Sequence, residues 1–188
     1  MLYNSQERDF TGINLAGVDL TGKDLSTNKL NLSGANLTRA KLGKAGLNSV
    51  NLTGANLKNA KLSETQLYQT NLSEANLENT DLRKANLCGT KLGKANLKNA
   101  DLSKVNLSLQ VDLSGAVLSG SNLNKVNLRQ VNLNEVDLSY VNLSNANFLS
   151  ASLESANLQK VKLHQAFYNT VTVGSMSPWR RVEMLKDR

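Results

Sequence analysis

The chain has 188 residues, of which 40% are hydrophobic and only 4% aromatic, and its formal net charge is +7. Its single cysteine, Cys88, excludes an internal disulfide framework, and no stretch reaches the roughly 20 apolar residues that a transmembrane helix requires. Because the N-terminal sequence MLYNSQERDF contains no apolar run typical of a signal peptide, we expect a cytoplasmic protein with no membrane contact.

A five-residue repeat organises the chain. Apolar residues recur at every fifth position from Phe10, and leucine does so without exception from Leu32 to Leu107. Two residues before each leucine stands a small or short branched residue, such as Ala35 or Val50, and the residue between them is mostly Asn, Asp or Lys. Each repeat therefore has two positions suited to an interior and three suited to a surface.

The period of five fits neither standard element. On an α-helix, five residues turn the chain by about 500°, and on a flat strand alternate leucines would point to opposite faces. A chain that turns a corner every five residues places all of the leucines inside. Because the sequence also aligns at twenty residues, we predict a solenoid of about eight four-walled coils, stacked at about 4.8 Å and about 40 Å long.

Two interruptions shift the phase of the repeat. The gap from Leu25 to Leu32 is two residues too long, and the gap from Leu107 to Leu113 is one residue too long. We predict outward bulges at residues 26–30 and 109–110 that leave the stack of coils intact.

The C-terminal segment has a different pattern. The repeat ends near residue 174, and Ser177 followed by Pro178 is typical of a helix start. Trp179, Val182 and Leu185 then fall at helical spacing, which favours a short capping helix over a frayed tail. The predicted organisation is an N-terminal cap segment, a solenoid and a C-terminal cap or tail, at residues 1–9, 10–174 and 175–188.

The repeat resembles the motif A(D/N)LXX of the pentapeptide-repeat family. It occurs here as ANLTR, ANLKN, ANLEN, ADLSK and VNLNE, and the match extends from about Phe10 to Val173. The resemblance implies an all-β fold, a right-handed quadrilateral β-helix. The handedness is implied by the family and not by the spacing.

One wall, here called the basic wall, is defined by Leu42, Leu62, Leu82 and Leu102. Its outward cations are Lys41, Lys44, Lys61, Arg83, Lys84, Lys104, Lys125 and Lys162. They could form a strip that binds anions such as nucleic acid. We favour a solvated wall of mixed charge, because Glu64, Asp81 and Asp101 interrupt the cations and would screen a phosphate track.

The next wall along the chain, here called the interaction wall, is defined by Leu47, Leu67, Leu87 and Leu107. Its outward positions include the candidate partner-binding residues Tyr68, Cys88, Leu109, Arg129, Leu149 and Phe167. Exposed apolar groups aligned on one side are typical of a protein-binding surface, although scattered exposed apolar residues are also normal. We predict that Cys88 is an incidental exposed thiol.

The wall that precedes the basic wall, here called the asparagine wall, is defined by Leu37, Leu57, Leu77 and Leu97. It stacks Asn36, Asn56, Asn76 and Asn96, whose amides we expect to bond from coil to coil. The remaining wall, defined by Leu32, Leu52, Leu72 and Leu92, is here called the fourth wall.

Catalytic and metal-binding signals are absent from the sequence. The single histidine, His164, lies about three coils, or roughly 14 Å, from Asp101, the nearest acid on its wall. Cys88 and His164 fall on different walls and cannot form a zinc site. No glycine-rich phosphate loop is present. We therefore predict no enzyme activity, no cofactor and no metal.

The favoured function is a non-enzymatic rigid scaffold or protein-interaction module with an unidentified protein partner. The resemblance offers an alternative, a DNA mimic that interacts with gyrase, but mimicry requires an acidic surface and this chain carries +7. Direct nucleic-acid binding through the basic wall is a further alternative. A monomer is favoured over a dimer formed through the C-terminal end, because its four basic residues would crowd across a two-fold axis.

Overall fold

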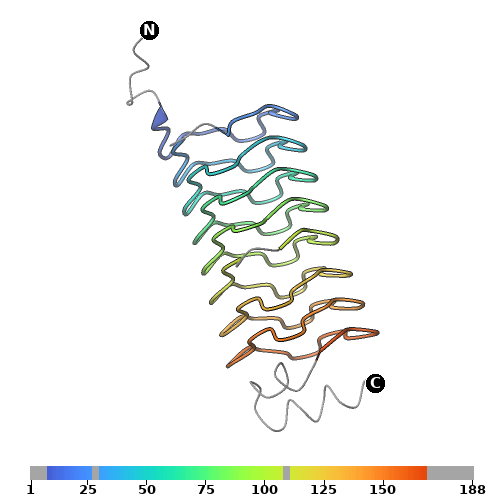
Figure 1. The fold of residues 1–188 in the computed structure, drawn as a ribbon. Helices are drawn as coiled ribbons and strands as arrows, with labels where there is room; N and C mark the ends of the chain where they lie inside the picture. Colours follow the sequence, from blue (N-terminus) through green and yellow to red (C-terminus); the bar gives the residue numbers. More distant parts are fainter. Residues whose placement is uncertain (1–7, 27–29, 108–110, 169–188) are drawn as a thin grey trace.

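The computed structural model describes residues 8–26, 30–107 and 111–168. Over these ranges the chain winds into a stack of similar coils that rises steadily from one end of the molecule to the other (Figure 1). Neighbouring coils pair in parallel through single bridged residues, as Asn31 with Asn51 and Asn51 with Asn71. The predicted solenoid is therefore confirmed.

The spacing of bridged residues confirms both phase shifts. Partners lie 22 residues apart at the first coil, as in the bond from Asn36 to Asn14, and 20 apart in the regular region. The spacing becomes 21 where Asn122 bonds Asp101 and then returns to 20. The extra residues thus leave the stack intact. Of the bulges predicted at residues 26–30 and 109–110, residues 27–29 and 109–110 lie outside the described ranges, and Leu30 is buried and not outward.

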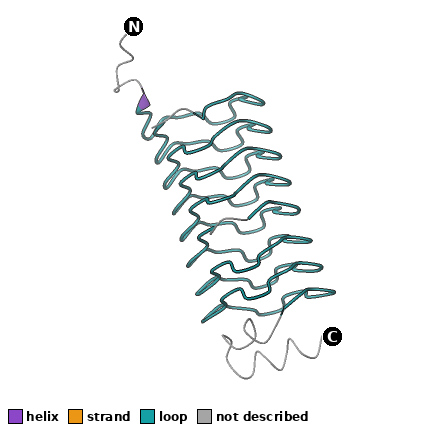
Figure 2. Cartoon of the chain, viewed as in Figure 1, coloured by secondary structure: helices purple, strands orange, loops and turns teal. Residues whose placement is uncertain are grey.

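Each wall consists of one residue that forms a β-bridge with the neighbouring coil, followed by a turn. The amide of Ala35 donates to the carbonyl of Leu32 at 3.1 Å, closing a turn over the two residues between them, and this bond recurs along the coils. Because the turn uses two of every five residues, the described chain forms isolated bridges and no continuous strand, as Figure 2 shows.

Three predictions concern residues outside the described ranges. The N-terminal cap falls almost wholly within residues 1–7, and the capping helix with Trp179, Val182 and Leu185 falls within 169–188; both are outside the described ranges. The choice between monomer and dimer depends on the same C-terminal residues and stays a prediction.

The core is a column of leucines lined by small residues. Leu52 and Leu57 on adjacent walls are both fully buried, as is Ala55 between them. Both inward positions of the repeat are therefore confirmed. The narrow interior accommodates one phenylalanine, Phe148, which stacks on Tyr168 with ring centroids 5.5 Å apart.

The residue before each leucine shapes the turn that follows. Asn56 Oδ1 accepts a hydrogen bond from the amide of Lys58 at 3.2 Å, and the other asparagines of this wall accept the same bond. Coil-to-coil bonds between these amides are fewer, as from Asn96 to Asn76 at 3.3 Å. The predicted amide column is confirmed only in part, because the side-chain oxygens are used first within their own turns.

The corner that ends each wall has a left-handed backbone. On the fourth wall, Gly34 and Gly54 occupy this corner with φ of 64° and 65°, and Glu74 follows in the same column with φ of 61°. A residue with a side chain is strained in this left-handed conformation, whereas glycine adopts it without strain. Glycine, however, has more backbone conformational entropy in the unfolded chain, which offsets part of that advantage. We expect Glu74→Gly to raise the free energy of unfolding by about 0.5–1 kcal/mol in urea denaturation. Gly54→Ala should lower it, and a change of the same sign in both variants would contradict the argument.

The first coil is held partly by ionised aspartates. The hydroxyl and amide of Thr21, and then Lys41, lower the pKa of Asp19 from 3.8 to about 2. The pKa values of Asp9 and Asp24 are lowered in the same way, chiefly by Thr11 and Ser26. Because these pKa values are lower in the folded state, their stabilisation is complete above about pH 4 and is lost as the pH falls towards 2.

We therefore expect the first coil to open before the rest of the rod in acid. Between pH 4 and 2, amide hydrogen exchange corrected for intrinsic rates should accelerate more around Asp19 than around the buried Leu77. Asp19→Asn should reduce this pH dependence. Equal acceleration along the whole rod would rule out the role given to the first coil.

Candidate functional site

Ion pairs neutralise part of the charge on the N-terminal half of the basic wall. Lys41 pairs with Asp19 at 3.2 Å and Lys84 with Glu64 at 3.6 Å. Arg83 donates to both carboxylate oxygens of Asp81 at 2.8 Å, and this contact lowers the pKa of Asp81. The mixed-charge interpretation of this half is therefore supported.

Arg83 also lies close to both aspartates of a like-charged pair in consecutive coils, Asp81 and Asp101. Asp81 bridges Asp101 in the next coil, and Arg83 Nε lies 3.9 Å from Asp101 Oδ2. The guanidinium therefore compensates both negative charges. A shallow groove of about 470 Å³ crosses this region and contains both signs of charge; it is lined by Ser63, Glu64, Arg83, Lys84, Asp101, Ser103 and Lys104.

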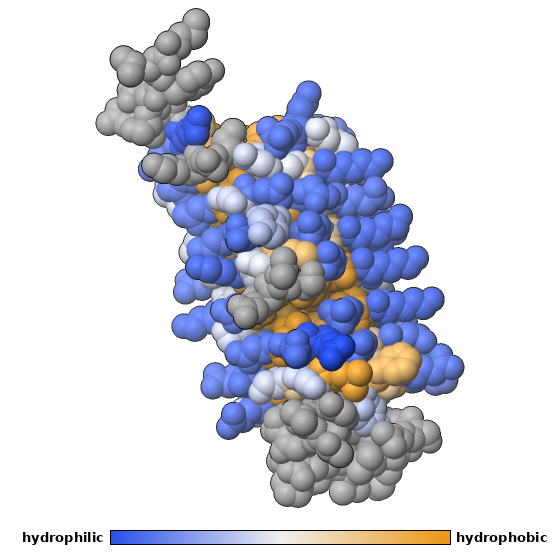
Figure 3. Space-filling view, in the orientation of Figure 1, coloured by the Kyte–Doolittle hydropathy of each residue, from blue (hydrophilic) through white to orange (hydrophobic). Residues whose placement is uncertain are grey.

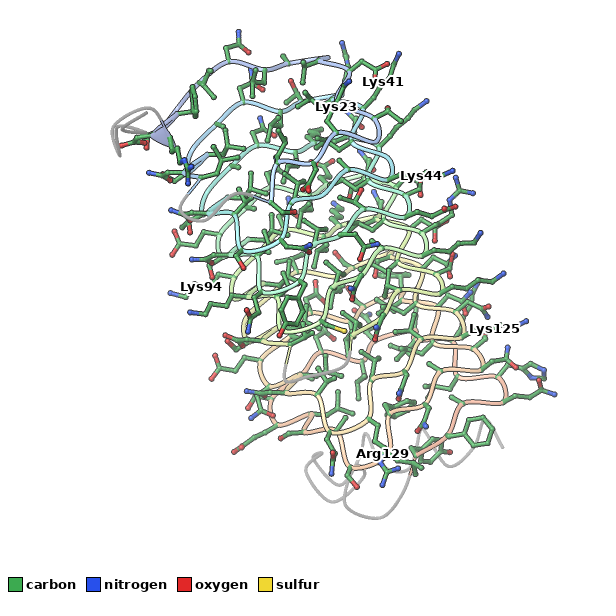
Figure 4. All side chains as sticks on the ribbon, turned by 45° about the horizontal axis from the view of Figure 1, so that its top comes forward. Lys23, Lys41, Lys44, Lys94, Lys125 and Arg129 are labelled. Carbon is green, nitrogen blue, oxygen red and sulfur yellow. The ribbon has the colours of Figure 1, made fainter. Side chains whose placement is uncertain are left out.

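The other predicted cations of the basic wall remain unpaired. Lys44, Lys61, Lys104, Lys125 and Lys162 are exposed and form no ion pair with any described residue. Figure 4 shows Lys44 and Lys125 on one edge of the rod, Lys94 on the opposite edge and Arg129 near the C-terminal end.

The interaction wall exposes several of its predicted residues. Tyr68 is 39% exposed and Phe167 61% exposed, Arg129 is exposed and Leu149 is half-buried. Leu109 lies outside the described residues. Figure 3 shows apolar surface in the lower central part of the rod, with hydrophilic side chains along both sides.

The prediction of an exposed thiol at Cys88 is wrong. Cys88 is buried, with 6% of its surface exposed. It stands directly after Leu87, in the same column as Tyr68 one coil earlier. The bulky side chain of Tyr68 stands about 4.8 Å away in the preceding coil, and we attribute the burial of the smaller thiol to this neighbour. Cys88 therefore does not belong to the surface that a partner could contact.

Sequence reasoning missed an aromatic corner. Tyr140 is 54% exposed at a left-handed position with φ of 59°, and Lys160 Nζ lies 5.2 Å from its ring centroid. On the same wall, Val117, which bridges Asp137, is 36% exposed. Aligning the corner column, where asparagine stands at Asn79 and Asn99, would have identified Tyr140 as an exception.

The metal-ligating residue types are dispersed over the described part of the chain. No group of three or more His, Cys, Asp or Glu residues in these ranges could hold a metal ion. His164 is exposed on the basic wall, whereas Cys88 is buried on the interaction wall. In the same ranges, no helix has the length and apolar character needed to cross a membrane.

Comparisons with known proteins identify the repeat. A model of the family described as pentapeptide repeats matches eight copies, over residues 31–69, 70–108, 112–148 and 132–167. No curated protein matches the chain.

Several solved structures are similar. QnrB1, a plasmid-mediated fluoroquinolone resistance protein, is 16% identical with a TM-score of 0.57, covering 93% of this chain and 98% of that chain. HetL, a pentapeptide repeat protein involved in heterocyst differentiation regulation from the cyanobacterium Nostoc sp. strain PCC 7120, is 27% identical with a TM-score of 0.39, covering 85% and 89%. A pentapeptide repeat protein from the Arabidopsis thaliana thylakoid lumen is 28% identical with a TM-score of 0.30, covering 61% and 70%.

Proposed function

The chain belongs to the pentapeptide-repeat family, and on this premise we propose that it is a non-enzymatic rigid scaffold that binds a protein partner through its interaction wall. The observation that carries the proposal is the exposure of Tyr68, Arg129 and Phe167 along one wall. Aromatic residues and arginine supply most of the binding energy in protein interfaces. Family membership also supports a right-handed coil, which we propose for this chain.

The construction of the rod supports the scaffold role. The backbone amide of Leu52 donates to the carbonyl of Asn71 in the next coil at 2.7 Å, and the amide of Asn51 donates to the carbonyl of Leu30 in the previous coil at 3.0 Å. The coil is therefore hydrogen-bonded to both of its neighbours. Side chains on one wall are thereby held in fixed columns. A surface of this kind binds without the entropy cost of ordering flexible loops.

Site-specific photocrosslinking tests the proposal. A photoreactive phenylalanine analogue at Gln130, an exposed corner beside the interaction wall, should form protein adducts in cells of the source organism. The same analogue at Glu135, on the exposed corner between the fourth wall and the asparagine wall, is the control and should form few. Both corners have similar φ, 62° and 59°, and Tyr140 at another corner shows that an aromatic residue is accommodated in this conformation. The absence of adducts at residue 130, or equal adducts at both corners, would overturn the proposal.

The gyrase alternative leads to a different expectation. The likeness to QnrB1 concerns the fold alone, and the cations of the basic wall give this rod the opposite sign of charge from a DNA mimic. We expect the purified chain to leave DNA supercoiling by gyrase unchanged, both with and without a fluoroquinolone. Protection of gyrase at a stoichiometric ratio would establish the alternative instead.

A further inference from the structure

Charges are segregated in the C-terminal half of the rod. From residue 102 to 168 the sequence contains four carboxylates, and all of them lie on the fourth wall or the asparagine wall: Asp112, Glu135, Asp137 and Glu154. The basic and interaction walls carry none over the same coils. They carry instead four cations, here called the cationic set: Lys104, Lys125, Arg129 and Lys162.

The cationic set is close-spaced and uncompensated. Lys104 and Lys125 occupy the same corner in consecutive coils, about 4.8 Å apart along the rod. Arg129 follows Lys125 within the same coil. Asn122 of that coil bridges Asn142, which in turn bridges Lys162, so Lys162 lies two coils further along the rod. All four side chains are exposed, and none forms an ion pair with a described residue. Their mutual repulsion is relieved when an anion binds among them.

Apolar groups accompany these charges. Phe167, 61% exposed, bridges Asn147 on the interaction wall, and Leu149 on the same wall is half-buried. A cluster of apolar and arginine side chains bordered by charge is the usual composition of a protein interface. A nucleic acid would be expected to use a longer cationic track or a row of stacking aromatics. The cationic set spans about three coils, roughly 14 Å, and the exposed aromatic residue that the basic and interaction walls present over the described part of these coils is Phe167.

We infer that the partner is a protein with an acidic surface surrounding an apolar side chain, and that it docks on the described parts of the basic and interaction walls that carry the cationic set, Leu149 and Phe167. The inference rests on the proposed scaffold function and specifies the chemistry of its partner. Carboxylates of the partner pair with the cationic set, while its apolar side chain packs on Phe167 and Leu149.

The test combines charge reversal with the photocrosslinker at residue 130. The reversal variant carries Lys104→Glu, Lys125→Glu, Arg129→Glu and Lys162→Glu. A matched variant with the same change in net charge carries Arg39→Glu, Lys44→Glu, Lys91→Glu and Lys94→Glu, all exposed in the N-terminal half. Glutamate already occupies the left-handed corner at Glu64 and Glu135, so the fold should tolerate both variants. Circular dichroism and thermal denaturation verify this before crosslinking.

We expect the adduct yield to fall at least about tenfold in the reversal variant and to persist in the matched variant. Mass spectrometry of the adduct should place residue 130 against an acidic segment of the partner. An adduct that persists in the reversal variant, or that disappears equally in both, would overturn the inference while leaving the scaffold function in place. No adduct in the unreversed protein would overturn the scaffold function itself. An adduct destroyed by nuclease would replace both with nucleic-acid binding.

Discussion

Replacing Leu77 by aspartate is expected to lower the free energy of unfolding by at least about 4 kcal/mol, because truncating a buried leucine alone costs about 2–5 kcal/mol and an unpaired buried carboxylate adds to that cost. Leu77 is fully buried in the middle of the regular stack. The buried residues of the described ranges include no Lys or Arg, and the neighbours of Leu77 in its column are Leu57 and Leu97. Urea denaturation of the full chain measures the effect.

The damage should be local as well as large. In a solenoid each coil contacts only its neighbours, so a broken coil separates two stacks that can each remain folded. Hydrogen exchange should therefore accelerate most around residue 77. Asn79→Asp introduces the same carboxylate at an exposed left-handed corner two residues away, a conformation that aspartate tolerates, and should change stability little. Equal destabilisation by the two variants would contradict the assignment of inside and outside.

Two buried hydroxyls should respond to removal in opposite directions. Ser121 Oγ is buried without a hydrogen-bond partner among the described residues, whereas Thr70 Oγ1 donates to the carbonyl of Leu47 at 2.6 Å. Removing an unsatisfied hydroxyl recovers a desolvation cost, while removing a bonded one loses a favourable contact. We expect Ser121→Ala to raise the free energy of unfolding by about 1–3 kcal/mol, and Thr70→Val to lower it by about 1 kcal/mol.

The replacement residues already occur at the same repeat positions in other coils. Alanine stands at Ala60 and Ala100 in the column of Ser121, and Val50 stands one coil before Thr70 in its own column. Shape is therefore nearly conserved in both variants. Thermal denaturation at one pH measures both effects. A loss of stability in Ser121→Ala would show that the hydroxyl has a partner that the described residues do not include.

The division between paired and unpaired charges bears on the proposed binding of an acidic partner. Pairs such as Arg83 with Asp81 and Lys84 with Glu64 neutralise part of the charge on the N-terminal half of the basic wall. Beyond Asp101 the same wall has no carboxylate, so attraction for an acidic partner is concentrated in one half of the rod. This asymmetry could orient a bound protein along the rod.

The sequence alone determined the architecture, because the physical requirement is local and repeated. Leucine at every fifth position from Leu32 to Leu107 can be buried together only if the chain turns a corner in each repeat, and the gaps after Leu25 and Leu107 specify how far the register shifts. The surface could be assigned to walls for the same reason, since Lys104 and Lys125 follow from counting within the repeat.

Only the tertiary structure decided how exposed and how paired those surface residues are. Cys88 and Tyr68 occupy equivalent positions in the repeat, yet Cys88 is buried and Tyr68 is 39% exposed, because shielding depends on the size of neighbours one coil away. In the same way, Lys84 pairs with Glu64 from the previous coil, while Lys104 forms no ion pair with any described residue. Contacts between residues twenty positions apart depend on the side-chain conformations adopted, and the repeat specifies only the columns in which they lie.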